Sequence, residues 1–389
     1  MPERHNELWN WYFFRRRIRC IIFLSRQYES FERRRIMNGN MPPITPRENA
    51  LIAYRHGTPM WIPTFFTDIS CFQACPQMER YTGNQSGKDY FGVDWTFVPQ
   101  MGAPMPTPGT ELFSDMTEWR EYVKIPDVDA IDWEKQAELD AHTDMLALAA
   151  GAGIVPIKDG GSIYDGDKLV VCMVINGMFE RLHAMMGMTN ALCALIEEPE
   201  ECKAYFHAIA DYKIAYFKKI AKYYKVDIIN AHDDYGTNDR LFMSVEMWRE
   251  LIKPELKRMV DACHECGVLY QHHSCGYIEP LLEDLIEIGV DAIDTLQASC
   301  NPNLKELKKK YGSQITFCGG FDNMNILDNP QATKEDIQNE YVRVINDLAP
   351  GGSYVVYPIT GTFGFIPDLL EKHFQYGMGF YAMQNQKPE

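Results

Sequence analysis

Short apolar runs alternate with segments of helical length along most of the chain, and this alternation constrains the fold more than any other feature. Apolar runs occupy residues 168–177, 226–236, 268–276, 290–297, 314–320 and 353–359. Helical patterns occupy residues 46–57, 132–153, 179–188, 199–225, 244–267, 278–289, 303–312, 333–352 and 367–384, with a kink or break expected at Pro254. This order is typical of a parallel sheet whose strands are joined by crossover helices.

Two further apolar runs, 59–66 (PMWIPTFF) and 89–99 (DYFGVDWTFVP), bring the predicted strands to eight. Eight such strands favour an α/β fold with a single (β/α)8 TIM barrel over an open doubly wound sheet, and 389 residues is a length that one barrel can use. No Gly-rich dinucleotide-binding or phosphate-binding motif follows any of the runs, which weakens the open-sheet alternative further.

The charge of the chain argues against two classes of partner. The formal net charge is −16, and an acidic surface repels both nucleic acid and anionic membranes. No apolar run reaches the roughly 18 residues that a membrane-spanning helix needs. A small molecule or another protein is therefore the expected partner.

The cysteines indicate a reducing compartment. There are 11, an odd number, and they are scattered rather than set at the short spacings of a disulfide framework. We therefore expect a cytoplasmic protein in which most thiols are small buried apolar groups. The CHEC segment at 263–266 has no second CxxC and is interpreted as structural, and Cys71 and Cys75 are expected to be unpaired.

Residues 1–36 differ in composition from the rest, because they contain nine arginines and no lysine. A basic arm and a targeting peptide are two interpretations. A third is that ERRRIM arises from a translated ribosome-binding site and that the true start is Met37. In each case we expect residues 1–36 to be a poorly packed basic extension and residues 37–389 to form the barrel domain.

Polar side chains follow several of the predicted strands at the point where each strand ends. The residues are His232, Asp233, Asp234, His272, His273, Cys275, Asp294, Cys318, Tyr357 and Thr360. Catalytic groups of a TIM barrel lie at the C-terminal ends of its strands. We therefore predict that these side chains face one mouth of the barrel.

His273, Cys275 and Cys318 are the predicted zinc ligands. His273 and Cys275 are two residues apart, so on an extended strand they point to the same side. Cys318 lies two strands later and is expected to converge on them. Two thiolates and one imidazole suit zinc and leave one coordination position open for catalysis. The alternative is that the His-x-Cys pair arises by chance and that Cys318 is a plain core thiol.

Four further residues are expected near the predicted zinc site. Asp233, Asp234 or Glu246 is expected to fill the fourth zinc position when substrate is absent. Asp233 and Asp234 are the predicted catalytic residues, through substrate binding or proton handling. Their alternative is a solvated pair in a loop, and His272 is interpreted as a packing residue or a partner of the ligands.

The chain resembles the uroporphyrinogen decarboxylase superfamily. The resemblance rests on GMFERLHAMMGM, on DDYGTNDRLFMSVEMWRELIKPELKRMVDACHECG, on HHSCGYIEPLLEDLIEIGVDAIDTLQ and on FCGGFD, and it extends from Pro46 to the C-terminus. It implies a (β/α)8 barrel. True decarboxylases of the superfamily carry an RQAGR-type signature after the first strand, and this chain has PMWIPTFFTDIS there instead. The corrinoid-linked methyltransferases carry His-x-Cys and a distant Cys as zinc ligands, which His273, Cys275 and Cys318 match.

The resemblance implies a bacterial, zinc-dependent enzyme that moves a methyl group between a small molecule and a separate corrinoid protein. Demethylation of a methoxylated compound is favoured, because aromatic residues gather near the predicted mouth. Trp61, Phe65, Tyr235 and Tyr357 are the predicted substrate-binding residues, although a chain with 12% aromatics places several there in any case. A homodimer is expected from the family likeness alone.

Two other functions remain open at this stage. One is a metal-independent decarboxylase of the uroporphyrinogen decarboxylase type, in which Asp233 or Asp234 stabilises a protonated intermediate. The other is a non-catalytic partner or activator of a corrinoid carrier.

Overall fold

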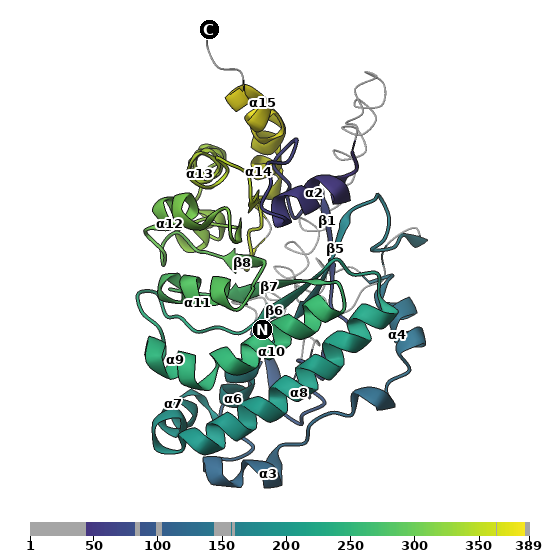
Figure 1. Ribbon diagram of the computed structural model, residues 1–389, viewed down its shortest axis with the longest axis vertical. Helices are drawn as coiled ribbons and strands as arrows, with labels where there is room; N and C mark the ends of the chain where they lie inside the picture. Colours follow the sequence, from purple (N-terminus) through teal and green to yellow (C-terminus); the bar gives the residue numbers. More distant parts are fainter. Residues whose placement is uncertain are drawn as a thin grey trace, which may run out of the picture.

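The computed structural model describes residues 44–81, 86–98, 103–143, 157, 160–362 and 364–385 (Figure 1). The predictions for residues 1–36 and for the second half of the helix at 132–153 lie outside the described residues. The first half of that helix is α4, Trp133–Asp140.

A parallel sheet of seven strands forms the centre of the molecule. Its order is β1-β5-β6-β7-β8-β9-β10, in which only β1 and β5 are separated by intervening strands of the sequence. The strands are β1 Ile69–Phe72, β5 Leu169–Val174, β6 Ile228–His232, β7 Leu269–Ser274, β8 Ala292–Thr295, β9 Thr316–Cys318 and β10 Tyr354–Val355. A parallel bridge between Thr64 and Val356 joins the segment before β1 to the far edge of the sheet. The sheet therefore closes on itself, and the predicted α/β barrel is confirmed.

The first two predicted strands are placed differently in the structure. Within 59–66 the only strand-like pairing is the single bridge of Thr64 to Val356, made by the backbone groups of Pro63 and Phe65, because the chain turns between Thr64 and Asp68. The Asp68 carboxylate holds this turn by accepting bonds from the Thr64 N–H at 3.0 Å and the Trp61 indole N–H at 2.7 Å. The pairing with β5 is made instead by Ile69–Phe72.

The predicted strand at 89–99 exists as β3, Asp94–Val98, but it does not belong to the barrel. It pairs antiparallel with β2, Gly87–Lys88, and with β4, Ala103–Pro106. A parallel neighbour needs a crossover of a dozen or more residues, usually a helix. In the described chain between β1 and β3 the only helical element is the single turn Pro76–Met78, so a hairpin is the pairing that this segment can make.

Most of the helices cover the outside of the barrel. Their bounds are α2 Pro46–Tyr54, α3 Trp119–Tyr122, α6 Met178–Met186, α7 Met188–Glu197, α8 Pro199–Tyr223, α9 Val245–Leu251, α10 Lys253–Glu265, α11 Leu282–Glu287, α12 Leu304–Tyr311, α13 Lys334–Leu348, α14 Ile366–Gln375 and α15 Phe380–Asn385. Figure 1 shows α8 and α10 lying side by side across the strands, and the two helices are in contact. The break predicted near Pro254 is confirmed, since α9 ends at Leu251 and Pro254 lies in the first turn of α10, where its missing N–H costs nothing.

Two apolar cores hold the layers together. The larger lies between the strands and the helices, and every residue of β5 and β6 is buried. The smaller fills the barrel interior and includes Ala50 and Tyr54 of α2 together with Cys318 and Tyr357. Thr45 caps α2 by accepting the Glu48 N–H at 3.1 Å, and α2 in turn packs into the interior of the barrel.

Two expectations about cysteines and membranes can be compared with the described residues. The ten cysteines found there, Cys71 and Cys75 included, form no disulfide, as predicted. Among the described helices, none has the length and apolar character required to cross a bilayer.

Candidate functional site

Several of the predicted site residues lie at the C-terminal ends of three neighbouring strands, β6, β7 and β8. His273 is in β7, and it pairs in register with His232 of β6 on one side and with Asp294 of β8 on the other. Asp234 follows β6, and Cys275 follows β7. Parallel strands present their carboxyl ends at one edge, so the prediction that strand-end polar groups share one mouth agrees with the geometry for these residues.

Asp234, His273 and Cys275 form a candidate metal group. Their ligand atoms all lie within 4.8 Å of one another. His273 Nε2 is 3.5 Å from Cys275 Sγ and 3.7 Å from an Asp234 carboxylate oxygen. With zinc bond lengths of about 2.0 and 2.3 Å and a tetrahedral angle, a nitrogen and a sulfur ligand lie about 3.5 Å apart. These three side chains therefore fit a single metal ion of that size.

Asp294 fixes the orientation of His273. Its Oδ1 accepts a bond from His273 Nδ1–H at 2.6 Å, and its Oδ2 accepts from Asn230 Nδ2 at 2.9 Å and from Gln271 Nε2 at 2.6 Å. Asp294 is completely buried. With the proton on Nδ1, the lone pair of Nε2 is directed at Cys275 and Asp234, which is the carboxylate–histidine arrangement of many metal sites.

The electrostatics around His273 favour positive charge. Burial alone would lower the His273 pKa, but the charges of Asp294 and Cys275 outweigh it and raise that pKa well above its usual range. His232 stacks on His273 with ring centroids 3.9 Å apart, and burial, followed by the charge of His273, lowers its pKa well below the usual range. A proton or a metal cation at His273 Nε2 is thus stabilised by Asp294, while His232 stays neutral.

Cys318 lies outside this group. Its Sγ is 3.8 Å from the Tyr54 hydroxyl and 3.9 Å from Gln271 Oε1, in the barrel interior. Strand β8 separates β9 from β7, so Cys318 and His273 are two strand spacings apart, about 10 Å. Asp294 belongs to β8, the strand between them. Burial raises the pKa of Cys275 to about 11 and that of Cys318 well above the usual range, so each sulfur needs a nearby cation to become a thiolate.

The two adjacent carboxylates have different surroundings. Asp233 accepts bonds from the N–H groups of Phe179 at 3.1 Å and Glu180 at 2.8 Å, and from the Tyr235 hydroxyl at 3.0 Å. It therefore holds the N-terminus of α6, and burial raises its pKa to about 6. Asp234 is partly exposed and accepts the Cys275 N–H at 2.7 Å. Of the two, Asp234 is the one whose carboxylate is presented to the candidate metal group.

The predicted substrate-binding residues divide into two sets. Phe65 and Tyr357 are in edge-to-face contact at 4.7 Å, and the Tyr357 hydroxyl donates to Asn230 Oδ1 at 3.4 Å, next to the buried partners of Asp294. Trp61 is engaged in the turn at Asp68. Tyr235 is completely buried, with its hydroxyl bonded to Asp233.

Other predicted roles can be placed by the same contacts. His272 is completely buried and stacks on Tyr235 at 5.4 Å, and neither of its ring nitrogens has a partner among the described residues. It is a packing residue, one of the two roles expected for it. Glu246 lies exposed in the first turn of α9 and does not belong to the candidate metal group.

Two groups near the mouth were missed by reasoning from sequence. Burial, followed by the charges of Asp234 and Asp233, raises the pKa of Glu180 to about 8. Arg80 lies in the loop after the turn Pro76–Met78, and its charge acts on Glu180. Glu180 stands in the GMFERLH motif, which was used only for the family resemblance, and no pattern around Arg80 points to the site.

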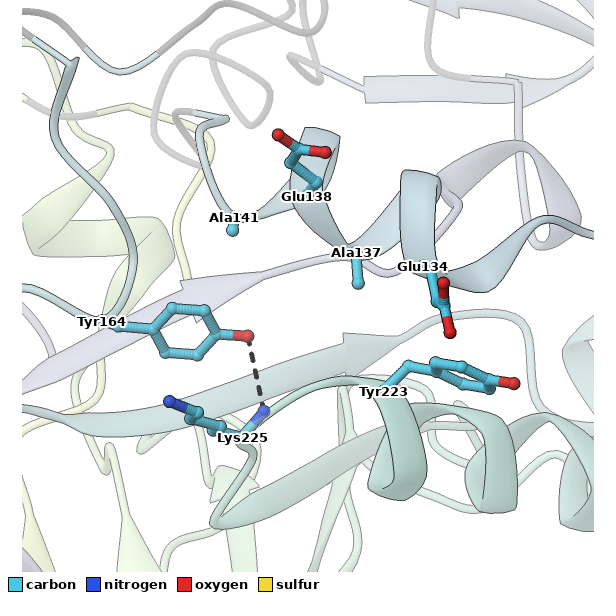
Figure 2. Close-up of a pocket in the computed structure, with 7 residues that line it drawn as sticks. All are labelled: Glu134, Ala137, Glu138, Ala141, Tyr164, Tyr223 and Lys225. Carbon is cyan, nitrogen blue, oxygen red and sulfur yellow. Dashed lines mark hydrogen bonds between the residues drawn. The ribbon is translucent and has the colours of Figure 1, made fainter.

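A separate cavity of about 340 Å³ lies at the other end of the barrel (Figure 2). Tyr164 and Lys225 line it, and these residues precede β5 and β6. The Lys225 N–H donates to the Tyr164 hydroxyl at 3.4 Å. The cavity is therefore at the N-terminal ends of the strands, away from the candidate metal group.

Comparisons with known proteins agree with this architecture. Among solved structures, a methyltransferase from Methanosarcina mazei is similar with a TM-score of 0.54 and 13% identity, covering 85% of this chain and 99% of that chain. An endo-beta-1,4-xylanase from Gloeophyllum trabeum has a TM-score of only 0.34 at 11% identity, over 58% of this chain and 70% of that chain. No curated protein matches the sequence.

A family model gives the decisive comparison. Residues 164–367, more than half of the chain, match the model described as "Uroporphyrinogen decarboxylase (URO-D)". This range contains Asp234, His273, Cys275 and Asp294. The predicted resemblance is confirmed, and the chain belongs to the uroporphyrinogen decarboxylase family.

Proposed function

We propose that the protein is a zinc-dependent methyltransferase that moves a methyl group between a small molecule and a corrinoid carried by a separate protein. The observation that carries this proposal is the Asp234, His273 and Cys275 group with Asp294 behind His273. A structural neighbour is named as a methyltransferase, which is consistent with the proposal, although that likeness concerns the fold.

The donor set supports zinc as the metal. One thiolate, one imidazole and one carboxylate are ligands that zinc accepts in tetrahedral sites, and three protein ligands leave the fourth position to a substrate. In this proposal Asp234 takes the place predicted for Cys318. Asp294 would raise the basicity of His273 and hold its ring, and Asp233 would keep α6 in place beside the site.

The proposed chemistry divides between the metal and the chain. A bound zinc ion would supply either a Lewis acid for an ether oxygen or a positive charge that keeps a thiol substrate ionised. In demethylation of an ether, the C–O bond breaks with its electron pair going to oxygen, and the methyl group passes to the corrinoid, which supplies the new pair. The chain's own task is to orient the methoxy group, for which Phe65 and Tyr357 are the proposed contacts.

Metal analysis of purified variants tests the proposal. We expect about one zinc per chain in the wild type, loss in Cys275→Ser, and retention in the matched variant Cys318→Ser. Loss in Cys318→Ser would restore Cys318 as a ligand. A folded, zinc-free wild type would reject the site and leave the metal-independent decarboxylase as the better hypothesis.

An activity assay tests the reaction class separately. Methyl transfer from a methoxylated aromatic compound to a purified corrinoid protein should occur with the wild type and fail with Cys275→Ser. If the wild type binds zinc but transfers no methyl group from a panel of ethers and thioethers, the metal site stands and the proposed reaction does not.

A further inference from the structure

Arg80 is a partly buried cation for which the described residues supply no carboxylate partner. Its Nη1 donates to the Pro104 carbonyl and its Nη2 to Asn176 Oδ1, both at 3.4 Å, and its buried Nε has no partner. The guanidinium lies 5.2 Å from the ring centroid of Trp95. Bonds of 3.4 Å are at the outer limit of hydrogen-bond geometry, so these contacts leave most of its donor capacity unused.

The neighbouring buried cations each form an ion pair with a carboxylate. Arg181 forms an ion pair with Asp89 at 2.6 Å, donates to the Glu79 carbonyl and lies 4.2 Å from the Phe91 ring centroid. Lys213 pairs with the Glu79 carboxylate and donates to the Ile175 carbonyl at 3.0 Å. Each of these two cations therefore has its own carboxylate, as buried charges require.

Within this cluster, Arg80 is the cation that has no carboxylate at ion-pair distance among the described residues. Glu79 and Asp89 are matched by Lys213 and Arg181, and Arg80 is the remaining cation. The charges of Glu180 and Asp234 act on Arg80 from a distance, but burial of a guanidinium that makes no direct ion pair remains costly, and an incoming anion would relieve that cost.

Contacts place Arg80 beside the candidate metal group. Its partner Asn176 follows β5 and precedes Gly177, the N-cap of α6. Gly177 is so close to Asp233 that an added Cβ would lie 2.4 Å from the Asp233 side chain. Burial lowers the pKa of Arg80, while the charges of Glu180 and Asp234 act in the opposite direction, so these carboxyl groups are within electrostatic reach.

We propose that Arg80 binds a carboxylate, or a similar small oxyanion, on the substrate whose methyl group reacts at the Asp234, His273 and Cys275 group. The guanidinium offers a planar fork that matches a carboxylate in a bidentate manner. The substrate would then be a small methylated acid that spans the distance between Arg80 and the metal position. The assignment of the reacting methyl group rests on the proposed function, whereas anion binding at Arg80 does not.

A competing interpretation is that Arg80 only ties the β2-β3-β4 sheet to the end of β5. In that case its loss would lower stability but would not change which ligands bind. A pair of probes that differ in charge but have nearly the same shape separates the two roles. 4-Methoxybenzoate and its neutral amide, 4-methoxybenzamide, form such a pair.

The test is equilibrium binding of both probes, by calorimetry, to the purified wild type, Arg80→Gln and Arg80→Lys, whatever their metal content. We expect the wild type to prefer the carboxylate over the amide at least about tenfold, because buried donors left without an acceptor penalise the neutral probe. Arg80→Gln should lose that preference. Arg80→Lys, which keeps the charge but not the fork, should retain part of it. Arg240→Gln, which alters an exposed arginine paired with Asp239, is the matched control and should behave like the wild type.

The remaining outcomes discriminate between the two proposals. Wild type that binds neither probe or prefers neither would reject an anion site, and equal carboxylate affinity in wild type and Arg80→Gln would assign Arg80 to structure alone. If Arg80→Gln fails to fold by circular dichroism, Arg80→Lys decides the result. Arg80-dependent binding without methyl transfer would reject the proposed function and keep the anion site, so the two proposals fail independently.

Discussion

His273 and Asp294 face each other on the neighbouring strands β7 and β8, with Nδ1 of the imidazole 2.6 Å from Oδ1 of the carboxylate. The same carboxylate accepts bonds from Asn230 and Gln271, so it has little freedom to move. The imidazole that faces Asp234 and Cys275 is therefore positioned before any ligand arrives. A preorganised histidine of this kind is what a tight metal site needs.

Asp294→Asn should lower zinc affinity 10- to 100-fold, because the amide is a weaker acceptor for His273 Nδ1–H and no longer favours positive charge on the ring. Competition with a chromogenic chelator measures this. Asp140→Asn is the control, since Asp140 is a buried carboxylate with three donors, Cys75, Gln136 and Tyr224, none of which belongs to the candidate metal group. Equal zinc affinity in Asp294→Asn and the wild type would contradict the role given to Asp294.

Gly276→Ala should both destabilise the protein and weaken zinc binding. Gly276 has a φ of +77°, and a Cβ would lie 2.4 Å from the Gly236 carbonyl oxygen, so the chain next to Cys275 would have to shift. Gly267→Ala is the matched control, because Gly267 has a φ of +74° and open space around it. Gly267→Ala should lower the free energy of unfolding by only about 1 kcal/mol, which is the cost of a left-handed backbone conformation for alanine. Chemical denaturation and zinc retention would both be measured, and identical behaviour of the two variants would refute the contact argument.

Asp233→Asn should lower the free energy of unfolding by about 1–3 kcal/mol. Asp233 receives two backbone N–H groups from α6 and one hydroxyl from Tyr235, and an asparagine would turn its own N–H₂ toward one of these donors. Tyr235→Phe removes a single bond and should cost about 1 kcal/mol. Denaturant unfolding of both variants tests whether Asp233→Asn is the more destabilising change. An Asp233→Asn variant as stable as the wild type would contradict the role given to Asp233 in holding α6.

His373 should make the protein less stable in mild acid. It is completely buried in α14, its Nδ1 is 2.9 Å from the Tyr341 hydroxyl, and burial lowers its pKa to about 4. In the unfolded chain His373 binds a proton near pH 6.5, whereas in the folded chain it stays neutral until about pH 4. The free energy of unfolding therefore decreases as the pH falls from about 6.5 toward 4. At pH 5 this loss amounts to about 2 kcal/mol.

Between pH 7.5 and pH 5, the free energy of unfolding of His373→Gln should therefore fall by about 2 kcal/mol less than that of the wild type. Denaturant unfolding at the two pH values measures the difference. The exposed His207 on α8 supplies the control variant His207→Gln, which should lose stability with pH as the wild type does. If His373→Gln follows the wild type, burial of His373 does not control acid stability.

Much of the site was predictable from local pattern. His273 and Cys275 are two residues apart at a strand end, and Asp234 follows the preceding strand, so the order of strands already places them at one edge. Asp294 was noted as a strand-end carboxylate, but its bond to His273 depends on the register between β7 and β8. Arg80 and Glu180 were not predicted, because they reach the mouth from a loop and a helix that carry no strand-end signal.

The sequence alone determined the alternation of strands and helices, the family, the break before α10 and the His-x-Cys pair, because each depends on residues close together in the chain. The tertiary structure decided which long-range partners meet. It placed β3 in a separate antiparallel sheet, brought Asp234 to His273, and kept Cys318 two strands away with Asp294 between them. Strand spacing and register set these distances, and both arise only when the sheet closes.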